Sequence, residues 1–261
     1  MSSSYSCKRI HNLGRLMKAI IETEIRADNM VIVHRLVDFT RTEAFRKTRG
    51  LSYTAIYAKA IATVVARHPA ANRRLIPIPF LHKLFPVVQQ FEGVDVAVAA
   101  ERAQEGLENV AFIDIVRDAD TTDLATIHET IRALQTSDEA NNKQWRDLNM
   151  VARLPFFLAR FLVTMPRFFP SQWKKYRGGS VLISSPGKYG MDTITTSWTS
   201  PLGFSYGFVQ PRPMVVAGEV VPRLSCHLIM SFDRRLLAGR PAGIVFSEII
   251  ELMEDPEKIE A

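Results

Sequence analysis

The spacing of apolar residues along the 261-residue chain separates helical segments from extended ones. Apolar positions three or four residues apart predict amphipathic helices. Four such helices are expected: 10–25, 52–67, one that opens at 120–123 and runs to about 135, and one that carries 244–253 and stops before Pro256. Alternating or continuous apolar runs bounded by turn residues predict strands. The expected strands are 29–39, 85–90, 94–99, 110–116, 180–185, 213–219 and 222–232.

A short helix is also expected at 40–47, directly after the first strand. Thr40 is suited to be its N-cap, and Glu43 three residues later completes a capping-box pattern. The chain has no internal repeat, low-complexity run or linker. We therefore expect one domain that covers residues 1–261.

The segment 141–179 differs from the rest of the chain because aromatic and basic residues alternate in it. Basic side chains recur every seven residues, at Arg146, Arg153, Arg160, Arg167 and Lys174. Its prolines favour several short helices over one long helix. One interpretation is a surface helical hairpin with an apolar underside. The alternatives are a lid, a partner-binding surface or an element that lies on a membrane surface.

Composition narrows the classes of protein that the chain can belong to. Hydrophobic residues make up 47% and charged residues 23% of the chain, which is enough apolar material for a sizeable core. The net charge of +6 favours anionic ligands, including phosphate-bearing coenzymes. No nucleic-acid-binding module accompanies this charge, so we expect no nucleic acid partner. The most apolar stretch, 151–169, contains three arginines, which argues against a membrane span.

The two cysteines, Cys7 and Cys226, have no metal-ligand spacing, and we expect neither a metal site nor a disulfide. A reducing compartment is the simplest interpretation, so we expect a cytoplasmic protein. No apolar signal-peptide core follows Met1. The first 20 residues are basic and lack acids, which leaves a mitochondrial transit peptide as the alternative.

Several stretches, in order, match the motifs of one enzyme family. The matching stretches are the helix ending in Arg67-His-Pro-Ala-Ala-Asn72, the strand Val94-Asp-Val-Ala-Val-Ala99, Ile115-Val-Arg-Asp-Ala-Asp120, Val181-Leu-Ile-Ser-Ser-Pro-Gly187, Met230-Ser-Phe-Asp-Arg-Arg-Leu-Leu-Ala-Gly239 and Glu254-Asp-Pro-Glu257. Together they resemble the catalytic domain of the dihydrolipoyl acyltransferases of 2-oxoacid dehydrogenase complexes, from about Arg15 onward. The segment 141–179 has no clear counterpart in the family and looks like an elaboration.

This resemblance implies an α+β fold of the chloramphenicol acetyltransferase type. The expected architecture is a two-layer sandwich in which helices cover a mixed sheet. The resemblance also implies a homotrimer with a pocket at each subunit interface, and larger cages can be built from such trimers. It implies no covalently bound cofactor and makes a coenzyme A thioester a candidate substrate.

The histidine that acts as the general base in this family is missing. The family carries a His-x-x-x-Asp-Gly motif whose histidine deprotonates the attacking thiol or hydroxyl. Here Arg234 occupies the histidine position and Ala238 the aspartate position, while Gly239 remains. A guanidinium stays protonated at physiological pH and cannot accept the proton. Arg234 could instead stabilise an oxyanion or hold a carboxylate or phosphate. Alternatively it forms an ion pair, with Asp233 or with another chain.

Three further side chains are candidates for the site. The family uses a hydroxyl to stabilise the tetrahedral oxyanion, and Ser184 and Ser185 lie in the matching strand. The sequence leaves open which of them faces the site. The resemblance places His34 in a strand that lines the family's substrate channel near a subunit interface, so it could replace the lost base. A satisfied core or interface histidine is the commoner role for such a residue. His227 precedes Arg234 by seven residues, roughly 20 Å along a strand, which is too far for direct substitution.

Two functions follow as hypotheses. The first is a divergent acyltransferase-like protein that acts on an acyl thioester or a related small molecule without the usual histidine base. The alternative is a catalytically inactive trimeric scaffold, or regulatory pseudoenzyme, that binds a protein partner.

Overall fold

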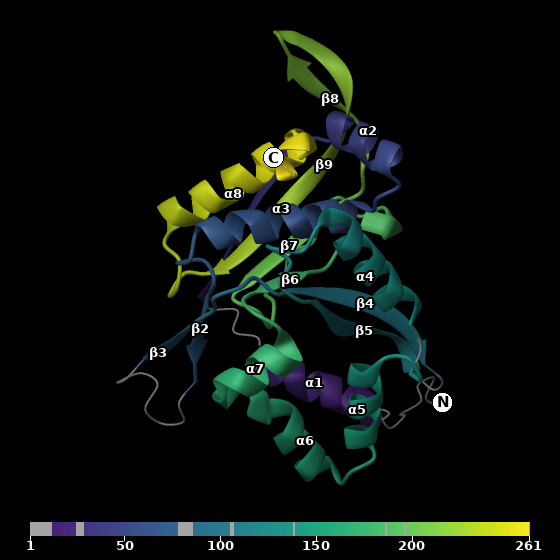
Figure 1. The fold of residues 1–261 in the computed structure, drawn as a ribbon, viewed down its shortest axis with the longest axis vertical. Helices are drawn as coiled ribbons and strands as arrows, with labels where there is room; N and C mark the ends of the chain where they lie inside the picture. The colour runs from purple at the N-terminus through teal and green to yellow at the C-terminus, as the bar shows by residue number, and fades with distance from the viewer. Residues whose placement is uncertain are drawn as a thin grey trace, which may run out of the picture.

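The computed structural model describes residues 12–24, 29–77, 86–104, 107–137, 139–185, 187–195 and 197–260. Its main sheet has the strand order β1-β9-β7-β6-β4-β5, and β8 pairs with the outer part of β9 (Figure 1). The strands of this sheet are β1 (Met30–Asp38), β4 (Val96–Gln104), β5 (Leu107–Val116), β6 (Val181–Ile183), β7 (Leu202–Tyr206), β8 (Gln210–Val216) and β9 (Glu219–Asp233). A separate hairpin consists of β2 (Arg73–Ile76) and β3 (Val87–Gln90).

The sheet is mixed because of its short central strand. β6 runs parallel to both neighbours, β4 and β7, whereas the remaining pairs are antiparallel. All three residues of β6 are buried. Parallel strands need cover on both faces, and this explains the continuous apolar run Val181-Leu-Ile183. The mixed α+β architecture predicted from the sequence is confirmed.

The helices fall into two groups. The helices and 3-10 helices are α1 (Asn12–Glu24), α2 (Thr40–Arg49), α3 (Tyr53–Arg67), α4 (Leu124–Thr136), α5 (Lys143–Ala152), α6 (Phe156–Thr164), η2 (Met165–Phe168), α7 (Pro170–Arg177), η3 (Gly187–Tyr189), α8 (Gly239–Glu254) and η4 (Pro256–Ile259). The two longest, α3 and α8, lie side by side over one face of the sheet (Figure 1). Ten residues of α3 are buried, which makes this helix the centre of the main core.

The elaboration predicted at 141–179 forms a second cluster around α1. Helices α5, α6 and α7 lie with α1 at the β5 side of the sheet (Figure 1). Their shared core contains Leu13, Leu16, Trp145 and Val163. The Trp145 ring lies 5.2 Å from the Phe112 ring of β5, which joins this cluster to the sheet. The segment thus forms several short helices, as its prolines predicted, and not the two-helix hairpin of one interpretation. Among the described residues, no helix is long and apolar enough to cross a bilayer.

Three local expectations differ from the structure. Thr40 is the first residue of α2 rather than its N-cap; Phe39 holds that position, and the Asp38 carboxylate accepts a hydrogen bond from the Thr40 amide. Strands β2 and β7 were not expected because of their composition. The β8–β9 turn lies at Ala217 and Gly218, both with positive φ, so β9 begins three residues earlier than expected. Cys7, His11, His82 and Phe85 lie outside the described residues.

Candidate functional site

Arg234 follows the end of β9 and is exposed. Its backbone amide donates to the Asn29 carbonyl oxygen at 2.9 Å, which fixes the chain beside the start of β1. Within the described part of the chain, its side chain makes no hydrogen bond or ion pair. The expected pairing of Arg234 with Asp233 is wrong, because Arg235 takes that carboxylate: its Nε donates to Oδ1 at 2.9 Å and to Oδ2 at 3.1 Å. The Arg234 guanidinium is therefore a permanent cation at the motif position, unpaired among the described residues.

Ala238 is the N-cap residue of α8 and makes no capping hydrogen bond through its side chain. Its backbone is already extended, with φ −77° and ψ 163°, as an N-cap requires. By resemblance an aspartate belongs here, where its carboxylate would accept from the first helical turn. Ala238 therefore supplies neither a side-chain cap nor a charge at the start of α8.

The structure separates the roles of the two candidate serines. The Ser185 hydroxyl donates to the Tyr206 carbonyl oxygen at 2.5 Å and accepts from the Gly187 amide at 3.2 Å. It holds the turn after β6 and lines a cavity of about 320 Å³. The Ser184 amide donates to the Phe204 carbonyl oxygen at 3.0 Å, and its hydroxyl makes no hydrogen bond among the described residues. Of the two hydroxyls, that of Ser184 is therefore the better candidate for chemistry.

Strand register places Ser184 and His34 on one row across the sheet. Ser184 follows the Ile183–Phe204 pair, so it lies level with Ser205. Ser205 pairs with Ile229, and Ile229 pairs with His34. Paired residues point to the same face, and this is the face opposite the α3–α8 core. Arg234 lies five residues beyond Ile229, roughly 16 Å along the strand. One protomer therefore does not bring Arg234 together with Ser184 or His34.

This second sheet face is polar, and sequence reasoning missed it. Along β9, Cys226, Leu228, Met230 and Phe232 face the core, whereas the alternate positions include Ser225, His227 and Ser231. The Ser205 and Ser225 hydroxyls and the His227 Nδ1 are buried and have no hydrogen-bond partner among the described residues. The alternation Ser-Cys-His-Leu-Ile-Met-Ser-Phe was visible in the sequence. The sequence did not show that the strand with Ser205 becomes the neighbour of β9.

His34 is exposed and adjoins His227 on this face. The centres of their rings lie 6.1 Å apart in an edge-to-face arrangement. Burial, together with the charge of Arg212, lowers the pKa of His227 below its ordinary value. His227 is therefore neutral at physiological pH, and a neutral imidazole can accept a proton.

The other described histidines and the cysteine have structural roles. His68 contacts the Glu248 carboxylate at 2.9 Å, and His128 Nδ1 accepts from the Ser52 amide at 3.2 Å. Cys226 is fully buried, and burial raises the pKa of its thiol to about 12. It faces away from His227, as expected for neighbours on a strand, so the two do not form a nucleophile–base pair.

A larger cavity, of about 480 Å³, lies beside the end of β9. Asp233 and Arg235 line it, as do Arg74 of β2 and Trp173 of α7. Arg74 was not among the residues expected at a site. Its sequence context, an Arg-Arg pair after a helix, gives no signal that the second arginine is buried.

The strand order and the helices that cover one face define the fold class. Chloramphenicol acetyltransferase superposes with a TM-score of 0.51 over 91% of this chain and 94% of that chain, at 12% identity. A structure of Azotobacter vinelandii dihydrolipoamide acetyltransferase, solved to examine one serine, one histidine and one asparagine in its catalytic mechanism, gives a TM-score of 0.72. That match covers 99% of this chain and 95% of that chain at 17% identity. The fold is chloramphenicol acetyltransferase-like.

Sequence comparison points to a particular family within that fold. Residues 171–261 match the family model for the 2-oxoacid dehydrogenases acyltransferase catalytic domain. The succinyltransferase component of the Haemophilus influenzae 2-oxoglutarate dehydrogenase complex is 25% identical over 98% of this chain. The alignment covers 56% of that relative, so the chain spans about half the length of the curated relative it matches. The chain resembles the catalytic domain of the dihydrolipoyl acyltransferases, as the motifs predicted.

Proposed function

We propose that this chain is a divergent acyltransferase-type domain that binds an acyl thioester, or a related acyl compound, between copies of itself. The observation that carries the proposal is the placement of Arg234 on the acyltransferase scaffold. It is exposed at the motif position, with no partner for its guanidinium within the described chain. A side chain retained only for structure would be expected to make a local contact.

A shared site follows from the distances within one protomer. Arg234 lies about 16 Å along the strand from the row that carries Ser184 and His34. A second copy that presents its own Ser184 row to Arg234 would bring the groups together. A homotrimer supplies such an arrangement, and the matched relative is a component of a larger complex. Size-exclusion chromatography with light scattering should give three times the 29.5 kDa chain mass, or a multiple of it for a cage.

The roles of the residues follow from their charge. The Arg234 guanidinium would bind the oxyanion that forms when a nucleophile attacks the thioester carbonyl, with Ser184 as a second donor. It cannot remove the proton of the nucleophile. The neutral His227, with His34 beside it, is the described group that would accept this proton. Coenzyme A would be the leaving thiol, and we propose no bound cofactor.

The test is acyl transfer from acetyl-CoA and succinyl-CoA to dihydrolipoamide, with thioester loss followed by chromatography. Loss of one oxyanion donor costs about a hundredfold in rate, so Arg234→Ala should lower turnover by about that factor. Arg240→Ala is the matched control, because Arg240 is an exposed arginine six residues away at the start of α8. The proposal fails if the wild type neither binds nor consumes either thioester, or if the two variants behave alike.

A noncatalytic scaffold is the second candidate, and one surface feature favours it. Phe157 and Phe161 of α6 are 77% and 63% exposed, at the outer side of the elaboration. Large exposed apolar side chains on adjacent helical turns are typical of binding surfaces. If the scaffold view holds, the wild type shows no acyl transfer, and the double variant Arg234→His with Ala238→Asp gains it.

We propose a cytoplasmic location, which fractionation of the native source would test.

A further inference from the structure

The 480 Å³ cavity beside the β9 end lies within one protomer and is distinct from the proposed acyl site. It is bounded by the end of α1 at Thr23 and Glu24, by Arg74, by Trp173 and Trp198, and by Asp233. Asp233 and Arg235 line the cavity, whereas Arg234 between them does not. Its volume is in the range of small-molecule sites, roughly 300–1,000 Å³.

Arg74 is the unusual residue of this cavity because it is a buried charge that makes no ion pair with a described carboxylate. The charge of Glu24 acts on it, but Glu24 forms its ion pair with Arg177. The residue is 2% exposed. Its Nε donates to the Gln89 side-chain oxygen at 2.6 Å, and its Nη1 donates to the Arg167 carbonyl oxygen at 2.9 Å. The guanidinium lies 4.4 Å from the centre of the Trp173 ring. Its Nη2 is buried and has no partner within the described part of the chain.

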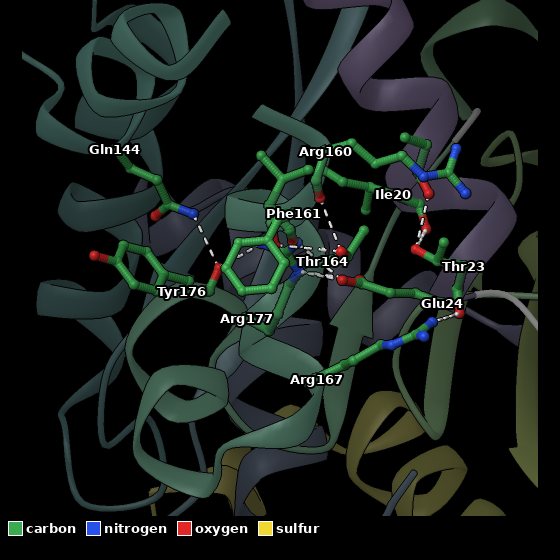
Figure 2. A network of polar contacts seen from close by, with 12 residues as sticks. Ile20, Thr23, Glu24, Gln144, Arg160, Phe161, Thr164, Arg167, Tyr176 and Arg177 are labelled. Atoms are coloured by element: carbon green, nitrogen blue, oxygen red, sulfur yellow. Dashed lines mark hydrogen bonds and ion pairs between the residues drawn. The ribbon is translucent and has the colours of Figure 1, made fainter. Parts of the chain in front are cut away.

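The carboxylates around the cavity are occupied by other arginines. Glu24 is held by Arg177, with Nε–Oε2 at 3.0 Å and Nη2–Oε1 at 2.9 Å (Figure 2). Asp233 is held by Arg235. Burial lowers the pKa of Arg74 to about 10, so the side chain is still charged at neutral pH. A desolvated cation is costly unless an anion compensates it.

The elaboration supplies one wall of the cavity and holds it in place. In Figure 2, Arg167 and Arg177 both reach back to the end of α1. Arg167 Nη1 donates to the Thr23 carbonyl oxygen at 2.9 Å. Trp173 Nε1 donates to the Gly179 carbonyl oxygen at 3.0 Å, which fixes the ring under Arg74. The buried position of Arg74 thus depends on α7 and on Arg167, which are far from β2 in the sequence.

We propose that this cavity binds a small molecule through an anionic oxygen group, a carboxylate or a phosphate, that pairs with Arg74. A planar guanidinium matches both groups, and charge-assisted hydrogen bonds are about twice as strong as neutral ones. The hydroxyls of Thr199 and Ser200 add donors, and the Trp173 and Trp198 rings provide apolar walls. The site is independent of acyl transfer and of Arg234.

The test uses inorganic phosphate and succinate as separate probes of the full chain, at constant ionic strength, by calorimetry and tryptophan fluorescence. Two of the three tryptophans line the cavity, so binding should change the emission. Arg74→Gln should weaken binding by about tenfold or more, since it removes the charge-assisted pair. Arg73→Gln is the matched control: Arg73 precedes Arg74 on β2 and makes the equivalent bond to Gln90 at 2.8 Å, but on the exposed side.

A second variant covers the case in which Arg74→Gln does not fold. Thr199→Phe fills the cavity and leaves Arg74 intact, so it should abolish binding in a folded protein. Arg234→Ala should bind both probes as the wild type does, which separates this proposal from the acyltransferase proposal. Binding of only one of the two probes supports the site and identifies which anionic group, phosphate or carboxylate, it recognises. The inference is overturned if neither probe binds the wild type at millimolar concentration, or if the variants at Arg74 and Thr199 bind as tightly as the wild type.

Discussion

The uncapped start of α8 gives a prediction about stability that is independent of function. We expect Ala238→Asp to stabilise the protein. Ala238 already has the extended backbone of an N-cap, and its carbonyl oxygen accepts from the Ala242 amide at 3.0 Å. A Cβ built on the neighbouring Gly239 would meet nothing within 4 Å, so the surroundings are open. The new carboxylate can therefore accept from the first-turn amides without rearrangement of the chain.

The magnitude follows from two contributions. A side-chain N-cap is worth about 1 kcal/mol relative to alanine. A negative charge at the N-terminus of a helix adds about 0.3–1 kcal/mol through the helix dipole. Ala238→Asn supplies the N-cap hydrogen bond without the charge, so it should give only the contribution of about 1 kcal/mol from the cap. For a chain of this length, 1 kcal/mol corresponds to a rise in Tm of about 2–4 °C.

The assay is urea unfolding followed by circular dichroism, with thermal melts as a second measure. The reverse control is Ser52→Ala, which removes an existing cap: the Ser52 hydroxyl accepts from the Ala55 amide at 3.2 Å. It should lower the free energy of unfolding by about 1 kcal/mol. If Ser52→Ala destabilises as expected and Ala238→Asp brings no gain, the account of the α8 terminus is wrong.

Three further predictions concern buried polar groups and close packing. Hydrogen bonds from Arg46 lower the pKa of Glu43 from 4.5 to about 2, so the contribution of this carboxylate to protein stability is complete above pH 4.5 and disappears as the pH falls towards 2. The difference in unfolding free energy between the wild type and Glu43→Gln should shrink over that range, and a constant difference would contradict this. Lys59 is 9% exposed and donates to three carbonyl oxygens, so Lys59→Met should cost about 2–4 kcal/mol in urea unfolding, and a cost under about 1 kcal/mol would refute its role. A Cβ on Gly207 would lie 1.9 Å from the Asp192 carbonyl oxygen, so Gly207→Ala should lower Tm in thermal melts, and an unchanged Tm would show that the loop moves freely.

Much of the fold was predictable because its strongest signals are local. The helix 52–67 and the elaboration at 141–179 follow from apolar spacing, caps and prolines, which act over a few residues. The order of the motifs predicted the family resemblance. It also showed that Arg234 stands where the family has its histidine. The strands β2 and β7 were missed because of their composition: β2 reads Arg-Arg-Leu-Ile, without alternation, and β7 contains Gly203 and follows Pro201.

The candidate site was less predictable because it depends on which strands become neighbours. The row from Ser184 to His34 crosses four strands, β6, β7, β9 and β1, and two of its members come from opposite ends of the chain. Likewise the sequence left Ser184 and Ser185 equivalent. Only the contact between Ser185 and Tyr206 of β7 distinguished them.

The sequence by itself determined the chemical identity of the motif position: a guanidinium stands at 234, and no fold can make it a proton acceptor near neutral pH. It also determined the helical elaboration, through short-range spacing. The tertiary structure alone decided that Arg74 is buried whereas Arg73 beside it is half-buried. It also decided that Glu24 and Asp233 pair with other arginines and not with Arg74. The physical reason is that burial and counter-ions are set by segments distant in sequence, here the end of α1 and helix α7, which no local pattern around Arg74 encodes.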